Sequence, residues 1–179
     1  MFIRVHSWAI LIGMTRVRHK MTINTSLRPS SGAWQTHPVS RNDIAMLGAL
    51  MHDAYAGTID DEDESPEKCE RVMESTMDGK YGPFLDTASF CISIGNKIVS
   101  AAIVTMWEDR PLLTFAITHP AYQGKGMARC LIEKSITALA KEGHAELRLV
   151  VTEGNTPAQR LYKNMGFTFV EERIKMFSR

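Results

Sequence analysis

Residues 112–141 of the chain read LLTFAITHPAYQGKGMARCLIEKSITALAK. The apolar run Leu112–Thr118 at its start predicts a buried strand. A turn containing Gly124 and Gly126 follows, and apolar residues then recur with a helical period as far as Lys141. A strand, a glycine loop and a helix in this order favour phosphate binding. Glycines let the backbone approach a ligand closely, and a helix N-terminus carries about half a positive charge.

The glycine loop does not match the two commonest phosphate-binding motifs. The Walker loop requires Lys-Ser/Thr at its end, but Met127 follows Gly126 here, and no G-x-G-x-x-G motif is present. The pattern Q/R-x-x-G-x-G/A does fit, with Gln123, Gly126 and Ala128 at its defined positions. In this respect the loop resembles the acetyl-CoA loop of the GCN5-related N-acetyltransferases (GNAT), which cradles the pyrophosphate of CoA.

A second informative stretch, EGNTPAQRLYKNMGF, occupies residues 153–167. The capping box at residues 156–159, with proline at its second position, predicts the start of a helix that ends before Gly166. We expect Asn155 to lie just outside this cap, with its amide free for a ligand. The stretch also resembles the late GNAT motif N-x-x-A-x-x-x-Y-x-x-x-G-F, which is matched by Asn155, Ala158, Tyr162, Gly166 and Phe167.

The rest of the chain predicts strands and helices in an order that suits this family. An edge strand is expected within residues 22–38, helices from Ser40 to Gly57 and from Ser65 to Met77, and a hairpin at residues 90–107 with its turn at Gly95-Asn96. Further strands are expected at residues 147–151 and 167–177. The resemblance implies an α/β fold of the GNAT acyl-CoA acyltransferase type. Its mixed, mostly antiparallel sheet has flanking helices, and the parallel strands at 112–118 and 147–151 splay apart.

The resemblance also implies a set of site residues. The pantetheine arm of acetyl-CoA would run along the strand backbone at Ala116, Ile117 and Thr118, and Asn155 would bond the same arm. The pyrophosphate would be held by Gln123, Gly124, Lys125, Gly126, Met127, Ala128 and Arg129. Tyr162 would act as the general acid toward the departing thiolate, since its reference pKa of about 10 keeps it protonated at neutral pH. Acetyl-CoA is the expected co-substrate, and no metal is expected.

The expected activity is direct transfer of an acetyl group from acetyl-CoA to a primary amine, with a small-molecule acceptor favoured. Two alternatives stay open: a protein N-terminus or lysine as acceptor, and a non-catalytic acyl-CoA-binding sensor. The general base is not assigned, because residues 115–118, Val150 and Val151 of the two central strands cannot ionise. His119, Glu153 and a water molecule are the candidates.

Composition limits the other partners. The chain has 179 residues, 44% of them hydrophobic, and a net charge of +1, which predicts one globular domain without a nucleic-acid or membrane partner. Cys69, Cys91 and Cys130 show no metal-binding or redox spacing, which favours a reducing cytoplasm and no structural zinc. A homodimer is compatible with these features.

The first 21 residues read as an appendage to a single N-acetyltransferase domain at residues 22–179. Their apolar core, Trp8–Ile12, is too short for a membrane span or a signal peptide, and Met14 and Met21 offer alternative starts.

An acidic run at residues 60–64, DDEDE, has two interpretations. It could form a collar that attracts a cationic amine. It could instead be a solvated loop whose charges favour the N-terminus of the next helix, and this second interpretation is preferred.

Overall fold

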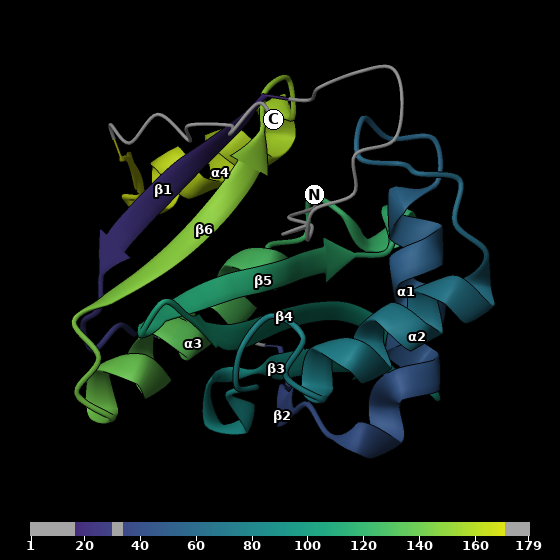
Figure 1. Ribbon diagram of the computed structural model, residues 1–179, viewed down its shortest axis with the longest axis horizontal. Coiled ribbons are helices and arrows are strands. Elements are labelled where there is room, and N and C mark those ends of the chain that lie inside the picture. Colours follow the sequence, from purple (N-terminus) through teal and green to yellow (C-terminus); the bar gives the residue numbers. More distant parts are fainter. Residues whose placement is uncertain (1–16, 30–33, 171–179) are drawn as a thin grey trace, which may run out of the picture.

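The computed structural model describes residues 17–29 and 34–170, which form one mixed sheet with helices on both faces (Figure 1). The strands are β1 (Arg18–Asn24), β2 (His37–Pro38), β3 (Phe90–Ile94), β4 (Lys97–Trp107), β5 (Arg110–Thr118), β6 (Glu146–Thr152) and β7 (Thr168–Phe169). The helices are α1 (Ile44–Tyr55), α2 (Pro66–Met77), α3 (Met127–Lys141) and α4 (Thr156–Met165). Short 3-10 turns lie at η1 (Arg41–Asp43), η2 (Asp86–Ala88) and η3 (Pro120–Tyr122).

The sheet has the order β2-β3-β4-β5-β6-β1-β7, and β5 and β6 form its parallel pair. The other neighbouring strands are antiparallel, and short turns join β3 to β4 and β4 to β5 as hairpins. Helix α3 makes the crossover that lets β6 run parallel to β5. The expected mixed, mostly antiparallel architecture is confirmed.

The two central strands share only a short stretch of pairing. Leu112 pairs with Arg148 and Leu113 with Leu149, and beyond these two pairs β5 and β6 diverge. Figure 1 shows the resulting V, with β6 turned away from β5 toward α4. The expected splay of the two strands is confirmed, and among the described residues it leaves the second half of β5 without a strand neighbour on that side.

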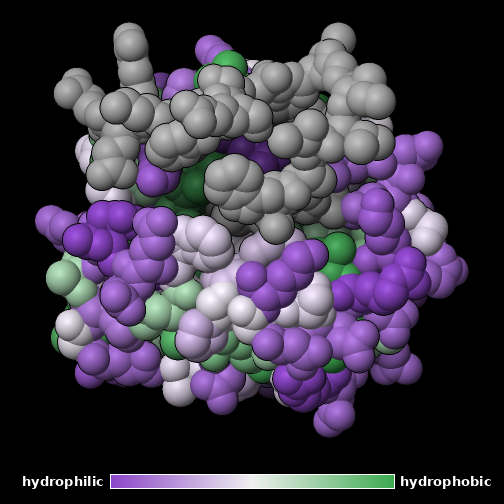
Figure 2. Space-filling model, in the orientation of Figure 1, coloured by the Kyte–Doolittle hydropathy of each residue, from purple (hydrophilic) through white to green (hydrophobic). Residues whose placement is uncertain are grey.

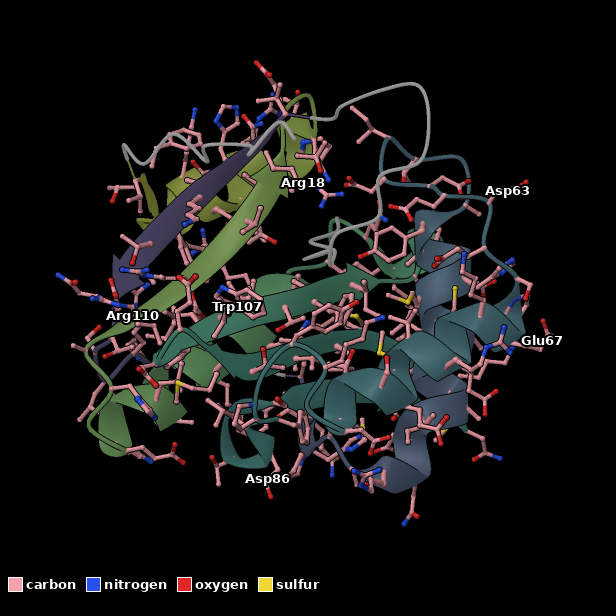
Figure 3. The ribbon with its side chains drawn as sticks, in the orientation of Figure 1. Arg18, Asp63, Glu67, Asp86, Trp107 and Arg110 are labelled. Atoms are coloured by element: carbon pink, nitrogen blue, oxygen red, sulfur yellow. The ribbon has the colours of Figure 1, made fainter. Side chains whose placement is uncertain are left out.

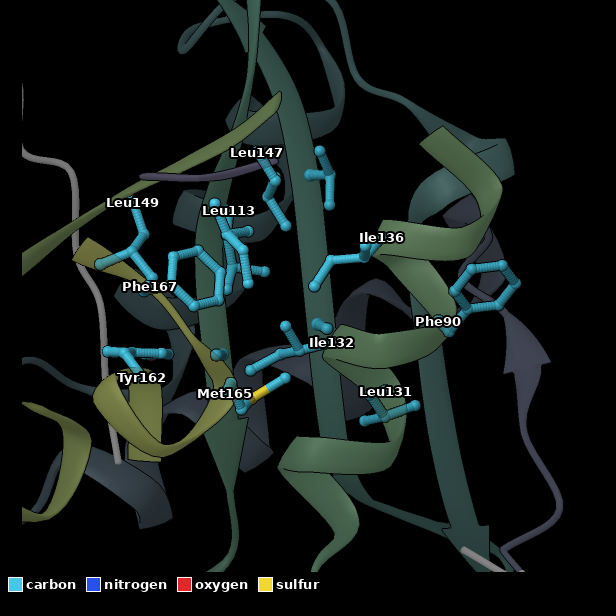
Figure 4. Close-up of a cluster of buried hydrophobic side chains, with 14 of the residues drawn as sticks. Phe90, Leu113, Leu131, Ile132, Ile136, Leu147, Leu149, Tyr162, Met165 and Phe167 are labelled. Carbon is cyan, nitrogen blue, oxygen red and sulfur yellow. The ribbon is translucent and has the colours of Figure 1, made fainter. Parts of the chain in front are cut away.

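The core lies on both faces of the sheet. Helices α1 and α2 cover one face, while α3 and α4 cover the other (Figure 1). On the second face, Leu131 and Ile136 of α3 and Met165 of α4 pack with strand residues Leu113 and Leu149 (Figure 4). Burial of this kind contributes about 25 cal/mol per Å² of apolar surface, so the packing of the helices fixes the sheet from which the loops project.

Strand β1 begins at Arg18 and pairs with β6 along its whole length, from Arg18↔Thr152 to Asn24↔Glu146. The boundary expected after Met21 therefore lies inside a strand, and residues 18–21 are part of the sheet. The expected last strand is seen as β7, while its continuation over residues 171–177 lies outside the described residues, as do residues 1–16 of the expected appendage. Within the described parts of the chain, no helix is both long and apolar enough to cross a membrane.

Candidate functional site

The glycine loop leaves β5 at the open end of the V. Gly124 and Gly126 adopt φ values of 75° and 77°, in the left-handed region that disfavours residues with a Cβ atom. A Cβ atom added to either glycine would meet nothing within 4 Å. The glycines are thus required by backbone conformation, and the space in front of them is open to a ligand.

Backbone N–H groups gather at this loop and at the first turn of α3. None of the backbone hydrogen bonds in the described part of the chain uses an N–H group of residues 124–129, and α3 begins at Met127. Unpaired N–H groups at a helix N-terminus, together with the helix dipole, form an anion site. The geometry therefore suits a phosphate or pyrophosphate group.

The side chains of the loop have different surroundings. The amide Nε2 of Gln123 donates to the carbonyl of Thr118 over 3.3 Å, which ties the loop to the end of β5. The ammonium group of Lys125 lies 4.9 Å from the centroid of the Tyr122 ring. Met127 is 1% exposed, so its side chain belongs to the core and only its backbone faces the loop.

Arg129 is the last of the residues expected to hold the pyrophosphate. Its guanidinium instead contacts Glu133, with Nη1 3.5 Å from Oε1, and Nη2 donates to the carbonyl of Asn164 over 3.3 Å. This side chain joins α3 to the last turn of α4. Of the two cationic residues expected to hold the pyrophosphate, Lys125 therefore lies at the loop.

The free edge of β5 presents backbone groups to the V. The N–H of His119 donates to the carbonyl of Val99, which fixes the alternation of this antiparallel ladder. By that alternation Ile117 faces β4, while Ala116 and Thr118 direct their backbone groups toward the open side. An extended ligand segment can bond there as an additional strand would.

Tyr162, on α4, is fully buried against the V. It is 0% exposed, its ring lies edge-on to Phe167 at 5.6 Å, and its hydroxyl has no hydrogen-bond partner among the described residues. Burial, and secondarily the negative charge of Asp60, raise the pKa of Tyr162 well above its usual value of about 10. A buried hydroxyl without a partner is unusual and indicates a group that awaits one.

Asn155 is the N-cap of α4, whereas the sequence predicted that it would lie just outside the cap. Asn155, not Thr156, caps α4: its Oδ1 accepts the N–H of Ala158 over 3.2 Å. Its Nδ2 donates to Oδ2 of Asp60 over 3.0 Å, and the residue is 5% exposed. The expectation that its amide is free for a ligand is wrong, because both ends of the amide bond to the protein.

Asp60 is the functional candidate that the sequence interpretation missed. It belongs to the acidic run, yet it is 3% exposed, and its Oδ1 accepts the hydroxyl of Thr152 over 2.6 Å. Asp63, in the same run, points outward from the loop (Figure 3). Neither the collar nor the solvated loop describes Asp60, and nothing in the letters DDEDE distinguishes it from its neighbours.

The candidates for the general base receive unequal support. The Nδ1 of His119 accepts the N–H of Ala121 over 3.2 Å, and its Nε2 lies 3.7 Å from Oδ2 of Asp53 on α1. Glu153 is exposed at the end of β6. His119 thus stands at the mouth of the V with a carboxylate partner, whereas Glu153 faces solvent.

A recess lies at the closed end of the V, beside the turn that joins β4 and β5. Figure 2 shows this face, on which apolar surface lines the bottom of a hollow, and Figure 3 locates Trp107 and Arg110 next to it. The recess is lined by Lys20, Trp107, Glu108, Leu112, Arg148, Leu149, Val150 and Val170.

Comparison with known proteins agrees with this geometry. The profile of the acetyltransferase (GNAT) family matches residues 52–167, which include both central strands, the glycine loop and α4. A [ribosomal protein bS18]-alanine N-acetyltransferase of Escherichia coli is 34% identical over 79 residues, or 44% of this chain and 53% of that protein. A streptothricin acetyltransferase of Streptomyces lavendulae is 30% identical over 95 residues, or 51% of this chain and 50% of that protein.

The chain thus matches about half the length of these curated relatives. Among solved structures, the ribosomal-protein-S18-alanine N-acetyltransferase of Escherichia coli superimposes with a TM-score of 0.58 and 25% identity. That superposition covers 75% of this chain and 77% of the other.

Proposed function

The chain belongs to the acetyltransferase (GNAT) family, and from this premise we propose that it transfers the acetyl group of acetyl-CoA to a primary amine of a small molecule. The observation that carries the proposal is the buried hydroxyl of Tyr162, which lacks a partner within the described residues. A departing thiolate at that position would supply the missing acceptor.

The residues present fit acetyl-CoA. The unpaired N–H groups of residues 124–129 suit the pyrophosphate, and the open glycine positions leave room for it. The free edge of β5 at Ala116 and Thr118 suits the amide-containing pantetheine arm. When bound, acetyl-CoA supplies the thioester whose acetyl carbon is transferred and whose sulfur departs.

The residues of the chain then act by positioning and by hydrogen bonding. A backbone N–H on the free edge of β5 polarises the acetyl carbonyl. Tyr162 donates a hydrogen bond to the departing sulfur, and its raised pKa keeps the hydroxyl protonated throughout the working pH range.

Asp60 takes the role of a positioning residue in this scheme. Its carboxylate bonds Thr152 at the end of β6 and Asn155 at the cap of α4. These two bonds hold the loop before α2 against the helix that carries Tyr162. The negative charge of Asp60 also contributes to the raised pKa of Tyr162.

The acceptor is proposed as a small amine, in line with the streptothricin acetyltransferase that matches half of this chain. The match to a protein-alanine acetyltransferase favours a second candidate, the α-amine of a protein N-terminus. Both acceptors are primary amines that must lose a proton before attack. We propose that His119 accepts this proton, with Asp53 as its partner.

The proposal is tested by thiol release from acetyl-CoA with two acceptor sets. One set holds small amines, including aminoglycosides and streptothricin, and the other holds short peptides that begin with alanine. Release with a small amine alone supports the proposal, while release with the peptides alone supports the second candidate. Binding of acetyl-CoA without release by either set would favour the sensor alternative and contradict both.

A further inference from the structure

Three side chains with metal-binding groups meet at the β2–β3 edge of the sheet, whereas the V lies between β5 and β6. His37 comes from β2, Asp43 ends η1 just before α1, and Cys91 comes from β3. One nitrogen of His37, one oxygen of Asp43 and the sulfur of Cys91 all lie within 4.8 Å of one another. The three residues are separated by up to 54 positions in the chain, so no spacing motif in the sequence predicts the cluster.

The ligand atoms lie close enough to share one zinc ion. The sulfur of Cys91 lies 3.3 Å from Nδ1 of His37 and 3.6 Å from Nε2, so it stands over the imidazole ring. Zinc binds thiolate sulfur at about 2.3 Å and imidazole nitrogen at about 2.0–2.1 Å, so in a tetrahedral site the sulfur and the bound nitrogen stand roughly 3.5 Å apart. The imidazole must turn to aim Nδ1 at such an ion, and an oxygen of Asp43 lies within 4.8 Å of both other ligand atoms.

Groups around the cluster already orient two of the ligands. The Nε2 of His37 lies 2.8 Å from Oγ of Ser93, which leaves Nδ1 as the nitrogen available to an ion. Oδ2 of Asp43 accepts the N–H of Ser40 over 2.8 Å and its hydroxyl over 2.9 Å. Metal-binding histidines and carboxylates are held in this way by outer hydrogen bonds, which fix the tautomer and the direction of the free lone pair.

A nucleophilic role for the same cluster does not fit. Cys91 is 0% exposed, so no substrate reaches its sulfur. A metal-bound thiol gives its proton to solvent, and the negative charges of Cys91 and Asp43 would then face the metal.

We propose that His37, Asp43 and Cys91 form a Zn²⁺ site whose fourth position is open to water. The mixture of one thiolate, one imidazole and one carboxylate favours zinc over magnesium or calcium, which prefer oxygen ligands alone. The ion joins the edge strand β2, the start of α1 and β3. It lies apart from Tyr162 and the glycine loop, so its role is to stabilise the sheet edge, and it departs from the expectation that the chain holds no metal.

The test begins with protein freed of metal by EDTA and dialysis, titrated with Zn²⁺ in competition with a chromophoric chelator. We expect one Zn²⁺ per chain. His37→Gln should weaken binding by more than about 100-fold, and Ser93→Ala, which removes the outer hydrogen bond, by about 10–100-fold. His144→Gln, a partly exposed histidine beside Glu142, is the matched control and should bind as the wild type does.

Substitution with Co²⁺ identifies the sulfur ligand. A thiolate-to-cobalt absorption band is expected in the wild type and in Cys130→Ser, whose cysteine is buried elsewhere, and should be absent from Cys91→Ser. Binding left unchanged by His37→Gln, a cobalt spectrum without the thiolate band, or the absence of stoichiometric binding would each overturn the site. If Cys91→Ser does not fold, zinc binding by His37→Gln still tests the site, because His37 is only half-buried.

Discussion

The side-chain amide of Asn155 donates to the carboxylate of Asp60 over 3.0 Å, and both residues are at least 95% buried. This bond connects positions 95 residues apart in the chain, one in the loop before α2 and one at the cap of α4. The side chain of Asn155 therefore makes two bonds, one that caps α4 and one to Asp60. The helix that carries Tyr162 is held in place by a residue from a loop with no recognisable motif.

Asp60→Ala should lower the free energy of unfolding by about 1–3 kcal/mol, because it removes the buried hydrogen bonds that Thr152 and Asn155 donate to the carboxylate. Glu62→Ala, at an exposed position of the same loop, is the control and should change stability by about 0.5 kcal/mol or less. Urea unfolding of both variants measures the difference. Equal stabilities for the two variants would remove Asp60 from the framework of the site.

Tyr162→Phe should lower turnover by about 10²–10⁴-fold, the range for loss of a proton donor, with little change in acetyl-CoA affinity. The same substitution should leave stability unchanged or raise it by about 1 kcal/mol, since the buried hydroxyl has no partner in the described residues. Steady-state kinetics and urea unfolding check the two effects separately. Tyr122→Phe, beside the glycine loop, is the control. Undiminished turnover in Tyr162→Phe would reduce the tyrosine to a packing role.

Local signals in the sequence were sufficient for the fold and for the glycine loop. The predicted helix through Lys141 is α3, the turn at Gly95-Asn96 joins β3 to β4, and Ser65 caps α2 through its side chain. Each of these features depends on residues a few positions apart, where periodicity and capping rules apply. The family resemblance then supplied the splay of β5 and β6.

Long-range contacts account for what could not be predicted. Asp60 finds Thr152 and Asn155 only when the chain has folded, and Arg129 bonds a carbonyl 35 positions away. The cluster that includes His37 and Cys91 arises in the same way, from separate strands. Spacing along a sequence contains no information about such contacts.

The lowered pKa of Glu146, at the closed end of the V, makes the free energy of unfolding depend on pH. Burial acts to raise the pKa of Glu146, but hydrogen bonds from Arg110 and Thr22 outweigh burial and hold it below its usual range. A carboxyl whose pKa is lowered by folding stabilises the protein above its unfolded pKa of about 4.3, and this contribution is lost as the pH falls through the folded pKa. Glu146→Gln should therefore be less stable than the wild type at pH 7, and the difference should shrink below about pH 4.3.

Urea unfolding between pH 7 and pH 3 measures this effect. Glu153→Gln, exposed at the other end of β6, should follow the wild type at every pH. A stability difference for Glu146→Gln that is constant over the range would show that packing, and not the charge of Glu146, joins β1, β5 and β6 at this point.

The glycine loop allows a prediction with a closely matched control. Gly126 and Gly95 have φ values of 77° and 59°, and a Cβ atom added to either would meet nothing within 4 Å. Gly126→Glu and Gly95→Glu should thus lose similar stability, about 1–2 kcal/mol for a side chain in the left-handed region. Only Gly126→Glu places a carboxylate where the N–H groups of residues 124–129 would hold a pyrophosphate.

Calorimetry with CoA separates the two effects. We expect Gly95→Glu to bind CoA as the wild type does, and Gly126→Glu to show no measurable binding, because bulk and like charge both oppose the pyrophosphate. Loss of binding in both variants would point to a general effect of backbone strain. Retained binding in Gly126→Glu would mean that the pyrophosphate lies elsewhere, and the assignment of the loop at residues 123–129 would have to be abandoned.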